Sequence, residues 1–113
     1  MTRAFVNAHC ARLPGAEVSD PWGGGHDCWK VGGRIFALIG ATEDQGVSVK
    51  CADVETAALL IDLGRAERAP YLHASWARIP WGRMDEAELG ERLDASYRLI
   101  RGKLPRKAQA ALG

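Results

Sequence analysis

Three basic residues and one tryptophan have the types and spacing best suited to binding chemistry. Lys30 and Lys50 each follow an apolar residue in a run typical of a strand, and Trp76 and Arg78 are two positions apart. Alternate residues of a strand point to the same side, so we expect all four on the face that the apolar residues leave open. Cations contact phosphates and an aromatic plate stacks on bases, which makes this set a candidate nucleic-acid or anion-binding site. The alternative is a solvated strand face, with Trp76 packed in the core.

A second basic cluster lies near the C-terminus and has no acid beside it in the sequence. Such a cluster can contact nucleic-acid phosphates, and it also suits the end of a helix, whose dipole favours positive charge there. Both interpretations stay open at this stage. The cluster consists of Arg98, Arg101, Lys103, Arg106 and Lys107.

The cysteines and histidines offer weaker chemistry. Cys51 precedes a helix that Asp53 is expected to cap, and a helix N-terminus can lower a thiol pKa, so a thiol-dependent enzyme is one alternative. Neither His26-Asp27-Cys28 nor His9-Cys10 has the ligand spacing of a zinc site. We therefore expect no metal, no cofactor and no catalytic residue, and we expect the three cysteines to be small core residues in a reducing cytoplasm.

The composition is that of an ordinary globular protein and not of a specialised polyelectrolyte. The 113 residues fit one domain, with 47% hydrophobic residues, 26% charged residues and a net charge of +1. This balance gives no general attraction to nucleic acid or to a membrane surface. No apolar run reaches the roughly 18 residues of a membrane helix, and the first residues do not resemble a signal peptide. We expect a cytoplasmic monomer that does not associate with membranes.

Three helices are predicted to support these residues. Thr2 can cap a helix to about Leu13, and Asp53 can cap another over 54–63. Asp85 begins the last helix, which Pro105 ends, and residues 106–113 form a basic tail that we expect to fray. The apolar stripe of this last helix, at spacings of three and four, is Leu89, Leu93, Tyr97, Ile100 and Leu104.

A three-stranded meander over residues 28–50 is predicted to be the centre of the fold. Gly32 and Gly33 suit the two positive φ angles of a tight hairpin turn, and Thr42–Asp44 supplies the next turn. A further strand is expected near 75–81, a short extended piece at 16–19, a glycine-rich loop at 20–27 and a charged connector at 65–70. The predicted fold is α+β: a single domain over residues 1–113, in the order α-β-β-β-α-β-α, with an antiparallel sheet covered by helices on one face.

Sequence pieces in the same order resemble the MmcQ/YjbR family across nearly the whole chain. No single piece is specific, but the ordered set is. The pieces are Leu13–Glu17, Trp29–Ala37, Val47–Lys50, Ala69–Leu72 followed by Trp76, Ala95–Ile100 and Lys103–Pro105. Two segments depart from the family pattern, the stretch 72–76 and the glycine-rich loop 22–27.

The resemblance implies a compact domain similar to the bacterial frataxin-like fold. It also implies a DNA-binding role suggested on structural grounds and no established catalytic residues. From the residues and the resemblance together we expect a non-enzymatic module that binds nucleic acid through the open sheet face. A protein- or small-ligand-interaction module using the Trp22–His26 loop is the alternative.

Overall fold

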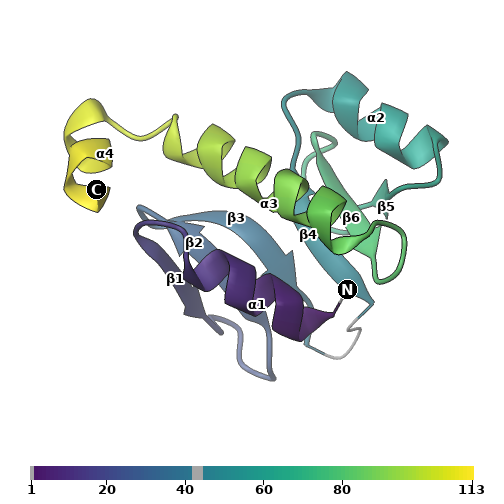
Figure 1. Ribbon diagram of the computed structural model, residues 1–113, viewed down its shortest axis with the longest axis horizontal. Helices are drawn as coiled ribbons and strands as arrows, with labels where there is room; N and C mark the ends of the chain where they lie inside the picture. The colour runs from purple at the N-terminus through teal and green to yellow at the C-terminus, as the bar shows by residue number, and fades with distance from the viewer. Residues whose placement is uncertain (1, 42–44) are drawn as a thin grey trace.

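The computed structural model describes residues 2–41 and 45–113 of the chain and gives an α+β domain (Figure 1). Helices and strands follow one another along the chain without a long linker. Their bounds are α1 Arg3–Ala11, β1 Ala16–Ser19, β2 Asp27–Val31, β3 Arg34–Ile39, β4 Gly46–Lys50, α2 Val54–Asp62, β5 Glu67–Arg68, β6 Trp76–Pro80, α3 Glu86–Arg101 and α4 Arg106–Leu112.

The strands form one antiparallel sheet in the order β1-β2-β3-β4-β6-β5. Figure 1 shows α1 and α3 lying over the same face of this sheet, with α2 at one end of the molecule and α4 at the other. The core fills the space between α1, α3 and the strands. Its largest fully buried side chains include Val6, Val31, Phe36, Ile39, Val47, Val49, Ile79, Leu89 and Leu93. The predicted α+β class and the one-sided helix layer are confirmed.

Local sequence signals set most element boundaries as predicted. Thr2, Asp53 and Asp85 cap the three main helices, each accepting a hydrogen bond from a backbone N–H in the first turn. Gly32 and Gly33 both have positive φ, at 57° and 81°, as the tight hairpin turn requires. The predicted turn at 42–44 lies outside the described residues.

Three elements go beyond the predicted order. The extended piece at 16–19 pairs with β2 as an edge strand, and the connector contains β5, which pairs with β6. A two-residue strand has no pattern of its own and exists only through its neighbour, so the sequence does not reveal it. The tail forms the short helix α4, held by Arg101, whose guanidinium donates to the carbonyl oxygens of Gln109 and Gly113.

A serine of α3 bridges the two central strands where their own pairing stops. The register between β2 and β3 shifts at Trp29/Lys30, which leaves Phe36 as the extra residue of a bulge. The β3–β4 ladder contains only Ala37↔Val49 and Leu38↔Ser48. Beyond it, the buried Ser96 hydroxyl donates to the Phe36 carbonyl at 2.6 Å and accepts from the Lys50 N–H at 2.8 Å. This hydroxyl therefore replaces a missing ladder bond and positions Lys50.

Candidate functional site

The face of the sheet away from α1 and α3 carries a continuous row of side chains across all six strands. Direct register partners lie side by side on one face of a sheet, so the pairing fixes this row. Its members, in sheet order, are Ser19, Cys28, Leu38, Ser48, Arg78 and Glu67. The centre of the row, from Leu38 to Arg78, lines a concave site.

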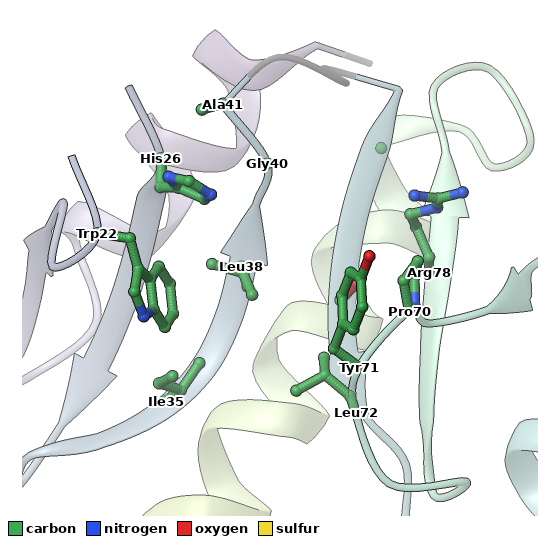
Figure 2. Close-up of a pocket in the computed structure, with 12 residues that line it drawn as sticks. Trp22, His26, Ile35, Leu38, Gly40, Ala41, Pro70, Tyr71, Leu72 and Arg78 are labelled. Atoms are coloured by element: carbon green, nitrogen blue, oxygen red, sulfur yellow. The ribbon is translucent and has the colours of Figure 1, made fainter. Parts of the chain in front are cut away.

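That site is a groove of about 720 Å³ with an apolar floor and two aromatic walls. Ile35 and Leu38 of β3 provide apolar surface, and Ser48 of β4 lies beside them. Figure 2 shows Trp22 on one side of the groove and Tyr71 on the other. Trp22 is 61% exposed and Tyr71 is fully exposed, so both rings are free to meet a ligand. A volume of this size suits a small organic ligand or part of a larger one.

The loop that carries Trp22 is held in place by its own polar groups. The Asp20 carboxylate accepts from the Gly25 N–H at 2.8 Å and the His26 N–H at 3.1 Å. These bonds, above all the one from Gly25, lower the pKa of Asp20. The ring of His26 meets Trp22 edge-on at 5.2 Å between centroids. The glycine-rich loop therefore presents Trp22 in a defined position.

The opposite wall has an unusual backbone. Tyr71 has a φ of +64°, and among the described residues it is the one non-glycine residue in the left-handed region. For a side chain with a Cβ this conformation costs roughly 1–2 kcal/mol. Tyr71 is also fully exposed, so its ring adds no core packing in return. Strain without a packing gain is typical of a position kept for function.

Among the described residues that line the groove, Arg78 is the one lysine or arginine, and its charge is balanced. The Arg78 guanidinium pairs with Glu67, at 2.7 Å from Nε and 2.6 Å from a terminal nitrogen to the same carboxylate oxygen. This pair leaves the described part of the groove lining with little net charge. Its surface is suited to a flat, mostly uncharged ligand, with Arg78 and His26 available for polar contacts.

The structure brings the four residues expected on the open face together only in part: Lys50 and Trp76 are direct cross-strand partners, and Trp76 lies two residues before Arg78 on β6. Arg78 lines the groove, and Lys30 lies just outside it, as the cross-strand partner of Ile35. Trp76 is half-buried and packs against the core. Lys50 is the last residue of β4 and lines a separate pocket with residues of α2 and α3. The sequence signal that best located the groove was the tryptophan of the glycine-rich loop, and nothing in the sequence predicted the strained backbone of Tyr71.

The thiol chemistry considered from the sequence is not supported at Cys51. Its side chain is only 2% exposed, and burial raises its pKa, although Arg92 and Lys50 act in the opposite direction. The expectation that the helix N-terminus lowers this pKa is therefore wrong, because desolvation of the thiolate outweighs it. Cys10 and Cys28 are also buried, and burial raises the pKa of each.

Two features are absent from the part of the chain that the structure describes. No group of three or more histidine, cysteine or acidic side chains lies close enough to hold a metal ion within residues 2–41 and 45–113. Over the same residues, no helix has the length and apolarity needed to cross a bilayer.

Comparison with known proteins gives both a family and a fold. The YjbR family model matches residues 11–99. The crystal structure of the Deinococcus radiodurans protein DR2400, described as a DUF419 domain, superposes with a TM-score of 0.85 over 99% of this chain and 88% of that one. The sequence identity is 23%, so this likeness concerns the fold. No match was found among curated proteins. The family model covers most of the chain, and the protein therefore belongs to the YjbR family.

Proposed function

We propose that this protein is a non-enzymatic binding module whose ligand presents a flat ring to the groove on the open sheet face. The observation that carries the proposal is the pair of exposed aromatic walls, Trp22 and Tyr71, over the apolar floor of β3. Exposure of an aromatic side chain to water is unfavourable when the side chain does not pack in the core. A ligand ring stacked between Trp22 and Tyr71 would bury both. A small organic molecule fits the volume and near-neutral charge of the groove best.

The test is a direct binding measurement with two simple probes, indole and adenine. Trp22→Ala and Tyr71→Ala each remove one wall and should weaken binding at least about fivefold, since a stacked ring contributes about 1–3 kcal/mol and about 1.4 kcal/mol is tenfold. Leu63→Ala is the matched control, because Leu63 is a large apolar residue, 65% exposed, that lines neither pocket. Saturation-transfer NMR titrations would report the affinities. The proposal fails if neither probe binds, or if both wall variants bind as the wild type does.

Single-stranded nucleic acid is a second candidate, favoured by the presence of Arg78 and Lys30 on the same face as the aromatic walls. Bases would stack on the walls while the two cations contact phosphates. Fluorescence anisotropy with a labelled thymidine oligonucleotide and its duplex would test this. Tighter binding of the single strand, weakened by salt and by Trp22→Ala, is expected. Preference for the duplex, or affinity that does not change with salt, would reject this candidate.

A further inference from the structure

We propose that a second pocket, between α3, the start of α2 and the end of β4, binds a phosphate group, either free or carried on a small organic molecule. This pocket is separate from the groove and has a volume of about 410 Å³. Three basic side chains line it: Lys50, Arg92 and Arg98. The rest of its lining is small or apolar apart from the Thr56 hydroxyl.

The fold brings these cations together from distant parts of the sequence. Arg92 and Arg98 are six residues apart on α3, with Ala95 between them on the same side of the helix. The short side chain of Ala95 leaves room where a larger residue would fill the space. Lys50 joins them because its backbone N–H is bound to Ser96 of α3 at 2.8 Å. The pocket therefore depends on the Ser96 hydroxyl, which also bridges β3 and β4.

The acids that would normally neutralise the two arginines are bound elsewhere. On a helix, an acid four residues before an arginine is its natural partner, and here these acids are Glu88 and Asp94. Glu88 instead pairs with Arg65, and Asp94 lies 2.8 Å from the ring of His9. Among the described residues, the guanidinium groups of Arg92 and Arg98 have no hydrogen bond or ion pair.

The nearby acid at the start of α2 is also engaged. The Asp53 carboxylate accepts from the Thr56 N–H and from the Thr56 hydroxyl, both at 2.7 Å, as the cap of α2. The Lys50 ammonium donates to the Cys51 carbonyl at 3.0 Å, and burial, followed by the positive charge of Lys103, lowers the pKa of Lys50. Positive charge therefore accumulates in this pocket, and no carboxylate is among the described residues that line it. A dianion would relieve the repulsion and accept several charge-assisted hydrogen bonds.

Isothermal titration calorimetry at fixed ionic strength tests the proposal, with inorganic phosphate and phenyl phosphate as probes. Arg92→Gln and Arg98→Gln should each raise the Kd for phosphate at least tenfold. Arg34→Gln should leave it unchanged, because Arg34 is an exposed arginine that lines neither pocket. Tighter binding of phenyl phosphate identifies an ester as the natural form, and equal or weaker binding identifies the free anion.

The phosphate pocket and the groove can be tested independently of each other. Trp22→Ala should not change phosphate binding, and Arg98→Gln should not change indole binding. Circular dichroism confirms that each variant is folded, so a lost titration signal reports the pocket. The proposal is overturned if neither phosphate probe binds the wild type, or if Arg92→Gln and Arg98→Gln bind phosphate as tightly as Arg34→Gln does.

Discussion

Replacing Ser96 with alanine tests the bridge between β3 and β4. The change removes the hydroxyl that donates to the Phe36 carbonyl and accepts from the Lys50 N–H. A buried polar group that loses its partner costs about 1–3 kcal/mol. The Phe36 bond is fully buried and the Lys50 bond is partly buried, so water can compensate at Lys50 in part. We therefore expect Ser96→Ala to lower the free energy of unfolding by about 2–3 kcal/mol, a large fraction of the stability of an ordinary domain.

Urea denaturation followed by circular dichroism measures this loss, and the slope of the transition should stay unchanged. Ser48→Ala is the matched control. Ser48 is also buried, at 5% exposure, but its hydroxyl has no hydrogen bond among the described residues. We expect the control to change stability by no more than about 0.5 kcal/mol. If Ser96→Ala costs no more than Ser48→Ala, the hydroxyl does not replace a ladder bond and the reasoning is refuted.

Three further predictions follow from backbone and burial. Tyr71→Gly should leave the free energy of unfolding unchanged or raise it, because relief of the left-handed backbone strain offsets the greater entropy of the unfolded chain. A clear loss of stability in urea would contradict this. Gly46→Ala should strongly lower the melting temperature, because the new Cβ would lie 2.2 Å from the Ile79 carbonyl oxygen. An unchanged melting temperature would contradict this and show that β4 can shift. Burial raises the pKa of Cys10 from 9.0 to about 12, so the folded thiol keeps its proton when the unfolded one ionises. The stabilisation that the protonated Cys10 thiol contributes is therefore complete below pH 9 and is lost toward pH 12. The difference in unfolding free energy between the wild type and Cys10→Ala should shrink over that range. A difference that stays constant would contradict the raised pKa of Cys10.

Sequence alone determined the parts of this protein that depend on short-range signals. Caps at Thr2, Asp53 and Asp85, the glycine pair of the hairpin and the apolar stripe of α3 each act within a few residues, so their pattern was visible in the chain. The family resemblance came from the same local pieces in order. These signals were sufficient for the α+β fold and for the helix layer on one face of the sheet.

Tertiary structure decided the sites. Strand alternation predicted one basic face. Lys50 is paired with Trp76 in the sheet, but it ends its strand and also lines a pocket with α2 and α3, while Arg78 is neutralised by Glu67 from a strand with no sequence signal. The aromatic walls come from loops about 50 residues apart, and whether Arg92 and Arg98 have acidic partners depends on which acids Arg65 and His9 bind. Such partnerships depend on distances between segments remote in the chain. Periodicity records only which face a residue occupies, whereas packing decides what it meets there.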